Sequence, residues 1–297
     1  YVGDAPNWQR VRWQTPDDDF IDLDWHMAPE VNNKAPLLVL FHGLEGSSQS
    51  HYAQAFAQTA QAWGWHMVVP HFRGCSGEIN RAPRAYHSGD YAEIDWILRR
   101  LKQQHEGPLY AVGVSLGGNA LMCWAAESGT QAHGITQAVV SICSPLDLTA
   151  SGNAIDSGFN KWIYARMFLK TMKPAAMQKL AQYPHLFDAN KVMAAQTLYA
   201  FDDAFTAPIH GFKDVADYWT RASAKPRMGA IRIPALAINA LNDPFVPAQS
   251  LPRLQDVSRH VRLWQPKHGG HVGFTCAPYP GNLSGLPQAV LEWMTHG

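Results

Sequence analysis

Short apolar runs and longer amphipathic segments alternate along most of the chain. Runs that are apolar on both faces are typical of strands buried inside a sheet; they lie at 36–41, 67–70, 110–114, 138–143 and 234–240, with a shorter run at 261–264. Helical spacing of apolar residues marks the segments 52–63, 88–105 and 288–294, and a helix-forming segment follows residue 115. This order predicts a mainly parallel central sheet flanked by helices.

The first part of the chain shows a different pattern. A short basic run opens residues 9 to 26, and then Ile21, Leu23 and Trp25 alternate with acidic residues. Alternation with one polar face predicts an antiparallel edge strand.

Residues 151–228 interrupt the regular order. This segment is helix-prone, rich in aromatic residues and Met, and contains no strand-like run. We therefore expect residues 1–150 and 229–297 to form the α/β core and residues 151–228 to form a helical cap (lid). In such sheets the ligand site lies beyond the carboxyl ends of the strands.

The first candidate catalytic motif is Gly-Val-Ser-Leu-Gly at 113–117, which begins within the strand at 110–114. The glycines allow a sharp turn from strand to helix, which leaves the Ser115 hydroxyl exposed at its tip. The N–H of Leu116 opens the following helix and is placed to stabilise an oxyanion. Because the pentapeptide also arises by chance, an ordinary turn is the alternative.

A serine nucleophile needs a base and an acid that orients the base. Asp243 follows the strand at 234–240, and His271 follows the strand at 261–264 in a glycine-rich loop. The order Ser, Asp, His is the one expected of α/β-hydrolases. His268 is the competing base, and Asp147 is the competing acid.

Two other loops carry polar residues that bear on this site. In His-Gly-Leu-Glu-Gly at 42–46, we assign the second oxyanion donor to the N–H of Leu44. We expect His42 to make a supporting hydrogen bond rather than to bind a metal, because no metal-ligand cluster accompanies it. For Arg73 we favour a structural role over contact with a substrate carboxylate or phosphate.

Composition narrows the function classes. The 297 residues include 24 Lys and Arg and 24 Asp and Glu, so no net field favours nucleic acid or an anionic membrane. The four cysteines form no Cys-x-x-Cys pair, and we expect reduced, buried thiols, which favours the cytoplasm. No apolar run approaches the ~20 residues of a membrane span, and no signal-peptide pattern is present. We expect no cofactor and no metal. The first residue is Tyr1 rather than Met, so the sequence leaves open whether a segment before it was removed.

Together, several motifs resemble the YheT-type branch of the α/β-hydrolases over nearly the whole chain. They are His-Gly-Leu-Glu-Gly at 42–46, Phe-Arg-Gly-Cys-Ser-Gly-Glu at 72–78, Tyr-His-Ser-Gly-Asp at 86–90, Gly-Val-Ser-Leu-Gly-Gly-Asn at 113–119, Phe-Asp-Asp-Ala-Phe-Thr-Ala-Pro at 201–208 and Gly-Gly-His-Val-Gly-Phe at 269–274. The resemblance implies a capped α/β-hydrolase fold, esterase or lipase activity on fatty acyl esters, and a triad of Ser115, Asp243 and His271. Its relatives include alcohol acyltransferases and phospholipases. Two features depart from the pattern: His71 stands where relatives often carry Asn, and the N-terminal membrane anchor of eukaryotic relatives is missing from this sequence.

The sequence thus predicts a serine hydrolase that cleaves carboxylic esters, on the resemblance fatty acyl esters, through an acyl-enzyme on Ser115. One alternative is an alcohol acyltransferase that uses the same acyl-enzyme, and another is a noncatalytic binding protein on a hydrolase scaffold. The cap residues Trp162, Met167 and Phe168 are candidates for lining an acyl pocket, with packing inside the cap as the alternative. We expect a small acyl ester as the binding partner.

Overall fold

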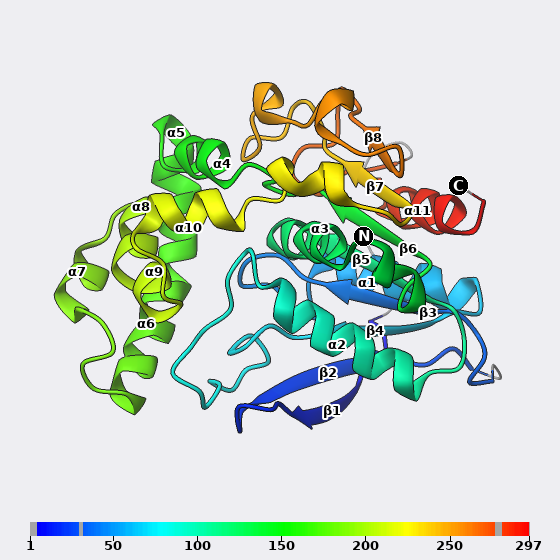
Figure 1. The fold of residues 1–297 in the computed structure, drawn as a ribbon, viewed down its shortest axis with the longest axis horizontal. Coiled ribbons are helices and arrows are strands. Elements are labelled where there is room, and N and C mark those ends of the chain that lie inside the picture. Colours follow the sequence, from blue (N-terminus) through cyan, green and yellow to red (C-terminus); the bar gives the residue numbers. More distant parts are fainter. Residues whose placement is uncertain (1–4, 30–31, 277–280, 297) are drawn as a thin grey trace.

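The computed structural model describes residues 5–29, 32–276 and 281–296 (Figure 1). Its strands form one sheet in the order β1-β2-β4-β3-β5-β6-β7-β8. Strands β3 to β8 run parallel to their neighbours among themselves, and β1 and β2 are antiparallel. The mainly parallel sheet predicted from the sequence is confirmed. The strands are β1 Gln9–Gln14, β2 Phe20–His26, β3 Leu37–Phe41, β4 His66–Pro70, β5 Leu109–Val114, β6 Ala138–Ile142, β7 Ala235–Ile238 and β8 Val261–Trp264.

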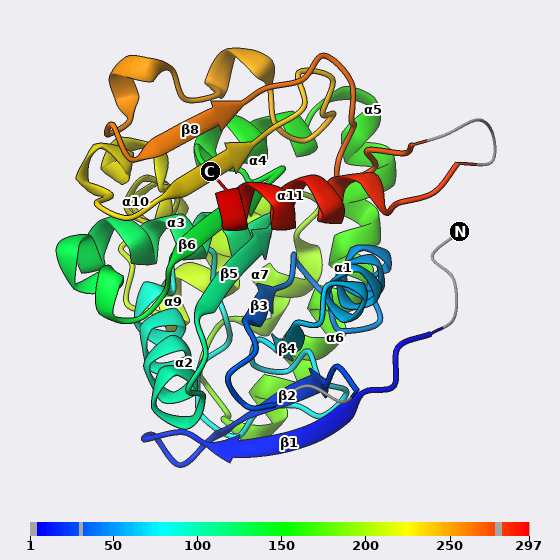
Figure 2. The ribbon, with the colours of Figure 1, turned by 90° about the vertical axis from the view of Figure 1, so that its right-hand side faces the viewer.

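Helices cover both faces of the sheet (Figure 2). Helices α2 (Tyr91–Gln104) and α3 (Leu116–Ser128) pack on one face, and α1 (His51–Ala62) and α11 (Gly285–His296) pack on the other. In β3, Leu37, Val39 and Phe41 belong to the first core, whereas Leu38 and Leu40 belong to the second. Burial on both faces explains why this strand is apolar at every position.

The N-terminal region differs from the predicted edge strand. Strand β1 takes the edge, and β2 lies between β1 and β4. The acidic face of β2 is buried because Arg10 pairs with Asp24 and Arg12 pairs with Asp22 across the two strands. The alternation therefore marks a strand with a neutralised polar face, and the basic run before it is the partner strand.

Helices alone occupy the described chain between β6 and β7, and most of them stand to one side of the sheet (Figure 1). Ala224 and Met228 nevertheless pack in the main core beside α3, so the chain rejoins the core before residue 228. The limits of a separate cap unit remain a prediction. These helices are α4 Leu148–Ile155, α5 Gly158–Asn160, η2 Lys161–Ala165, α6 Arg166–Gln182, α7 Ala189–Ala194, α8 Leu198–Phe201, η3 Asp202–Thr206, α9 Ala207–Ile209, α10 Val215–Ala222 and η4 Lys225–Ala230.

Three further short helices lie in connections of the core: η1 Gly129–Gly134, η5 Ala248–Ser250 and η6 Leu254–Asp256. Within the described residues, no helix has the length and apolar character needed to cross a membrane.

Candidate active site

Ser115 occupies the tight turn between β5 and α3. Its backbone has φ 52° and ψ −119°, which is a costly conformation for a residue with a side chain. Close packing around the turn requires glycine: a Cβ on Gly113 would lie 2.4 Å from the Cα of Gly118, and one on Gly117 would lie 2.4 Å from the carbonyl oxygen of Phe41. The sequence therefore folds locally into the elbow that Gly-x-Ser-x-Gly predicts.

Several other side-chain-bearing residues near Ser115 also have positive φ. This region favours glycine, and such strain gathers at functional sites. They lie in the loops that follow β3, β6 and β8, and they are Glu45 (55°), Cys143 (49°), Val272 (63°) and Phe274 (41°). The loops around the elbow are thus held in shapes that the surrounding contacts determine.

His271 lies between Asp243 and Ser115. Its Nδ1 is 2.9 Å from Oδ2 of Asp243, and its Nε2 is 3.2 Å from Oγ of Ser115. The Asp243 side chain is fully buried, whereas that of His271 is 19% exposed. The three side chains come from the ends of β5, β7 and β8, which the parallel sheet brings to one edge. This arrangement can take a proton from the serine and stabilise the resulting imidazolium.

Neighbouring contacts fix the acid and the base. The N–H of Phe245 donates to Oδ1 of Asp243 at 2.8 Å, and the Phe245 ring lies 4.5 Å from the His271 ring. The N–H of Gly270 donates to Oδ1 of Asn242 at 2.9 Å, which ties the loop of the base to the loop of the acid. The sequence analysis did not assign a role to Asn242 or Phe245. Their closeness to Asp243 in the sequence is the one feature that could have pointed to them.

The competing residues lie elsewhere. Asp147 is the N-cap of α4, where its Oδ1 accepts the N–H of Ala150 at 3.0 Å. His268 is exposed to solvent. The structure therefore brings Asp243 and His271 to Ser115, and it does not bring Asp147 or His268 to Ser115.

Two backbone N–H groups are free to face charge on a ligand. In the loop after β3, the N–H of Gly43 donates to the Tyr52 hydroxyl and that of Glu45 donates to the Tyr86 hydroxyl. The N–H groups of Leu44 and Leu116 have no hydrogen-bond acceptor within the described part of the chain. Both residues line the same cavity as Ser115. Unpaired backbone N–H groups in the cavity of the nucleophile are compatible with the oxyanion hole predicted from the sequence, which stays a prediction.

His42 holds the Leu44 loop in place. Its Nδ1 is 2.8 Å from the carbonyl oxygen of Gly43, and its Nε2 accepts the N–H of Phe72 at 3.0 Å. Burial lowers the pKa of His42 to about 3, so the ring is neutral. The expected supporting hydrogen bond is what the structure shows.

Arg73 is fully engaged by acidic residues of the chain. Its guanidinium donates to Glu93 at 2.6 Å, to Asp19 at 2.8 Å and to Asp17 at 2.9 Å. Although Arg73 lines the cavity, these carboxylates satisfy its charge, which supports the structural role.

Cys143 lies against the acid and the base. Ligand atoms of Cys143, Asp243 and His271 lie within 4.8 Å of one another, a set that can in principle bind a metal ion. However, burial above all, with the charge of Asp243 second, raises the pKa of Cys143 to about 12, so its thiol is protonated. The N–H of Val272 donates to its sulfur at 3.3 Å. We interpret Cys143 as packing that supports the His271 loop.

The cysteines are unpaired, as expected, but they are not all buried. Cys123 and Cys143 are buried, Cys75 is half-buried, and Cys276 is exposed. The backbone of Cys276 pairs with that of Asn282 in an isolated antiparallel bridge before α11, and its side chain is exposed.

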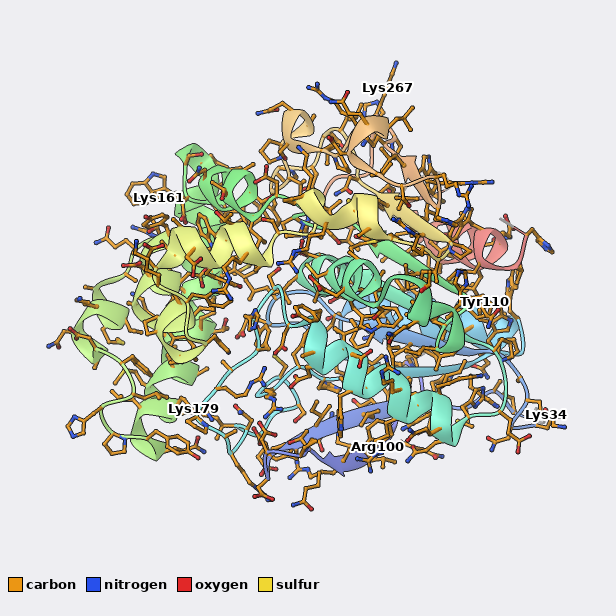
Figure 3. All side chains as sticks on the ribbon, viewed as in Figure 1. Lys34, Arg100, Tyr110, Lys161, Lys179 and Lys267 are labelled. Carbon is orange, nitrogen blue, oxygen red and sulfur yellow. The ribbon has the colours of Figure 1, made fainter. Side chains whose placement is uncertain are left out.

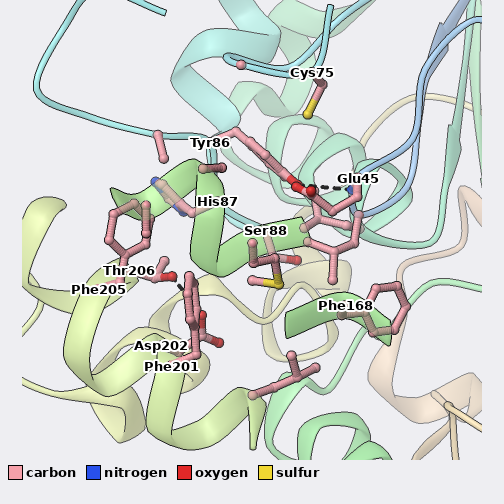
Figure 4. Close-up of a pocket in the computed structure, with 18 of the residues that line it drawn as sticks. Glu45, Cys75, Tyr86, His87, Ser88, Phe168, Phe201, Asp202, Phe205 and Thr206 are labelled. Carbon is pink, nitrogen blue, oxygen red and sulfur yellow. Dashed lines mark hydrogen bonds between the residues drawn. The ribbon is translucent and has the colours of Figure 1, made fainter. Parts of the chain in front are cut away.

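A cavity of about 290 Å³ is lined by Ser115 and His271 and by helices of the predicted cap. Figure 4 shows part of its lining, with Phe168, Phe201 and Phe205 labelled. Its lining is largely apolar, and the cap contributes Phe168, Met172, Phe201 and Phe205. Of the three cap residues predicted to line an acyl pocket, only Phe168 does so. Trp162 and Met167 are 61% and 52% exposed and lie outside the cavity lining, because they stand on the opposite face of the same helix.

Polar groups of this cavity are mostly paired with each other. The Tyr86 hydroxyl donates to the Glu45 carboxylate at 2.7 Å, and Asp202 accepts from Thr206 at 2.7 Å and from the Trp219 indole at 2.8 Å (Figure 4). Burial raises the pKa of Asp202 to about 6. These pairs leave the space between them suited to an apolar ligand.

The chain belongs to the alpha/beta hydrolase fold family, which it matches over residues 36–276. Its place within the family is the YheT-type branch, as the motifs suggested. It is 40% identical over 294 residues to the protein named "Putative esterase YheT" from Escherichia coli (strain K12), and the match covers 98% of this chain and 85% of that one.

More distant comparisons agree. Phospholipase ABHD3 of Mus musculus is 28% identical over 281 residues, which cover 90% of this chain and 66% of the relative. The solved structure of Est1E from Butyrivibrio proteoclasticus has a TM-score of 0.58 and 16% identity, covering 96% of this chain and 97% of that one. At that identity the likeness concerns the fold alone, and it matches the sheet and helix layers described above.

Proposed function

We propose that the protein is a serine esterase that cleaves carboxylic esters through an acyl-enzyme on Ser115. The observation that carries this proposal is the position of His271, with one ring nitrogen 3.2 Å from Oγ of Ser115 and the other 2.9 Å from Asp243. Relatives named as an esterase and a phospholipase support ester hydrolysis in general.

In the proposed reaction, Nε2 of His271 takes the hydroxyl proton as Oγ of Ser115 attacks the ester carbonyl carbon. The N–H groups of Leu44 and Leu116 stabilise the oxyanion of the tetrahedral intermediate. His271 then donates that proton to the leaving alcohol, and a water molecule, activated by His271, hydrolyses the acyl-enzyme. Asp243 orients the ring and stabilises the imidazolium throughout.

We further propose that the acyl group is a fatty chain. The cavity continues from Ser115 between apolar cap side chains, and Phe168 and Met172 belong to its lining. Flexible apolar chains bind well to Met and aromatic side chains, which adapt to their shape. The charged Arg73 is already paired, so nothing in that part of the lining demands a charged substrate.

The test is hydrolysis of a series of nitrophenyl esters of increasing acyl length by wild type, Ser115→Ala and Ser151→Ala. Ser151 is a buried serine of the same cavity and serves as a matched control. We expect Ser115→Ala to lose turnover and Ser151→Ala to keep it, with both variants folding cooperatively. Ester hydrolysis that survives in Ser115→Ala would refute the mechanism.

A further inference from the structure

The helix that carries Phe168 also has an exposed apolar face. Phe159, Trp162, Ile163 and Met167 are 74%, 61%, 43% and 52% exposed. Their spacing of three, one and four residues places them along one side of the continuous helical segment from α5 through η2 into α6. We call this set the outer stripe. Large apolar side chains that adjoin one another at the surface of a folded protein indicate a binding surface.

The same segment is strongly basic. Residues 157–187 contain no Asp or Glu, although the whole chain is neutral. Their basic residues are Lys161, Arg166, Lys170, Lys173 and Lys179, of which Lys179 is buried against the core loops and does not contribute to the outer surface. Arg166 and Lys170 are exposed, and they continue the helical spacing of the outer stripe. The Cζ atom of Arg166 lies 4.3 Å from the centre of the Trp162 ring. An exposed aromatic stripe with basic residues beside it is typical of helices that lie in a membrane interface.

The outer stripe is not needed to build the cavity. The inner side of the helix supplies Phe168 and Met172 to the cavity, and Ala165 and Leu169 are buried. One helix therefore forms a wall of the cavity with one side and presents apolar and basic groups to the outside with the other. Lys161 and Lys179, both labelled in Figure 3, lie toward its two ends.

We propose that the outer stripe is a docking surface for an anionic phospholipid bilayer. The apolar side chains would enter the boundary between headgroups and acyl chains, while Arg166 and Lys170 face phosphate groups. This deepens the proposed function by naming a lipid surface as the source of the acyl substrate, and only that link depends on the proposed function. Docking itself requires neither Ser115 nor turnover.

Charge favours this occupant over a second copy of the chain. A symmetric dimer places the same patch of both subunits against each other. Here that contact would bring two basic patches together, each with Arg166 and Lys170, and the segment has no acidic residue to compensate. Anionic headgroups instead complement these charges, and each basic residue near such a surface strengthens binding by about fivefold.

The test is co-sedimentation of the purified protein with vesicles of phosphatidylcholine alone and of phosphatidylcholine mixed with phosphatidylglycerol. Wild type and Ser115→Ala are measured side by side, so that failure of docking and failure of catalysis are separate results. We expect both proteins to bind the anionic vesicles, to bind the zwitterionic vesicles weakly, and to dissociate as salt is raised.

Two pairs of substitutions probe the outer stripe. Trp162→Ser with Met167→Ser should reduce binding to anionic vesicles by tenfold or more, a rough expectation from the apolar area removed. Arg166→Gln with Lys170→Gln should reduce it by about twenty-fivefold and leave binding to zwitterionic vesicles unchanged. Leu254→Ser and Lys267→Gln are controls that should bind as wild type does. Leu254 is 80% exposed outside the cap helices, and Lys267 lies at another end of the molecule (Figure 3).

Thermal unfolding checks that each variant is folded, which exposed positions should permit. Three results would overturn the proposal: no binding of wild type to anionic vesicles, undiminished binding by the Trp162 and Met167 double variant, or a lipid-free dimer that this double variant abolishes. The last result would assign the outer stripe to a second copy of the chain.

Discussion

The two walls of the cavity are built by different means. The core wall consists of loops at the ends of parallel strands, where hydrogen bonds hold His271 and the Leu44 loop in one geometry. The cap wall consists of helices whose apolar side chains line the cavity; Phe201 and Phe205 are buried, whereas Phe168 and Met172 are only partly buried. The core wall holds the reacting groups in fixed positions, whereas the cap wall leaves space that acyl groups of different shape can fill.

Apolar and polar contacts both join the two walls: Tyr164 and Phe168 of the cap pack against the Phe245 ring of the core, and hydrogen bonds connect α6 and the residue after it with the loop at 80–82. From α6, the ammonium group of Lys179 donates to the carbonyl oxygens of Asn80 and Ala82 at 2.6 and 2.9 Å, and the Tyr183 hydroxyl donates to that of Arg81 at 2.6 Å. Burial lowers the pKa of Lys179 to about 8. The difference between the walls suggests that substitutions in the core wall affect rate and folding, whereas those in the cap wall affect selectivity.

The largest effect is expected in the core wall, from the base and the acid. His271→Ala and Asp243→Ala should each lower kcat by roughly three or more powers of ten, because the nucleophile loses its proton acceptor or its orientation. His268→Ala and Asp147→Ala are the matched controls, and they should stay within about tenfold of wild type. Steady-state kinetics on one nitrophenyl ester decides. If His268→Ala is inactive instead, the base is His268 and the assignment to His271 is wrong.

Packing at the elbow gives the next largest effect. Gly113→Ala should lower the free energy of unfolding by about 3 kcal/mol or more, because its Cβ would lie 2.4 Å from backbone atoms that cannot move aside. Gly134→Ala is the control, since a Cβ there meets nothing within 4 Å. Urea unfolding measures both variants. If Gly113→Ala is as stable as Gly134→Ala, the backbone around the elbow can move aside and is less rigid than described.

Acid should act with opposite sign on one buried group of each wall. In the core wall, the folded pKa of His42, about 3, lies below its unfolded value, so its contribution to stability is complete above about pH 6.5 and is lost as pH falls toward 3. In the cap wall, the folded pKa of Asp202, about 6, lies above its unfolded value, so stability rises as pH falls from about 6 to 4. One pKa unit corresponds to about 1.4 kcal/mol.

Urea unfolding from about pH 7 to about pH 4 tests this contrast. The two contributions largely cancel in wild type, so relative to wild type His42→Asn should lose about 3 kcal/mol less between these pH values, and Asp202→Asn should lose about 2 kcal/mol more. If His42→Asn declines as wild type does, the buried neutral ring is not the cause.

The smallest expected effect belongs to the cap wall. Phe168→Ala should change the ratio of kcat/KM between short and long acyl esters by roughly tenfold, because it enlarges the cavity, and should leave kcat for the best ester nearly unchanged. Trp162→Ala, on the outer face of the same helix, should leave that ratio unchanged for soluble esters. If both variants shift selectivity equally, the cap helix is oriented differently from the structure.

The sequence predicts the core wall better than the cap wall for a physical reason. Strand runs and the glycines around Ser115 are local signals, and strand ends of a parallel sheet meet at one edge, so the candidate site follows from the fold. Helical spacing, by contrast, is the same for an inward and an outward apolar face. It therefore selected Trp162 and Met167 together with Phe168, and only tertiary packing separates them.

The N-terminal strands illustrate a second limit. Alternation of apolar and acidic residues in β2 predicts a water-exposed polar face, but Arg10 and Arg12 neutralise that face from β1. Pairing between strands is a contact that no single segment reveals. Asn242 and Phe245 were missed for the same reason, since their contacts with Gly270 and His271 exist only in the folded chain.

The central claim is that His271 and Asp243 make Ser115 the nucleophile. Labelling with an active-site fluorophosphonate, followed by peptide mapping in a mass spectrometer, tests it most directly. We predict one adduct, located on Ser115, absent from Ser115→Ala and formed far more slowly in His271→Ala. An adduct on another residue, or labelling of Ser115 at the same rate without His271, would contradict the account.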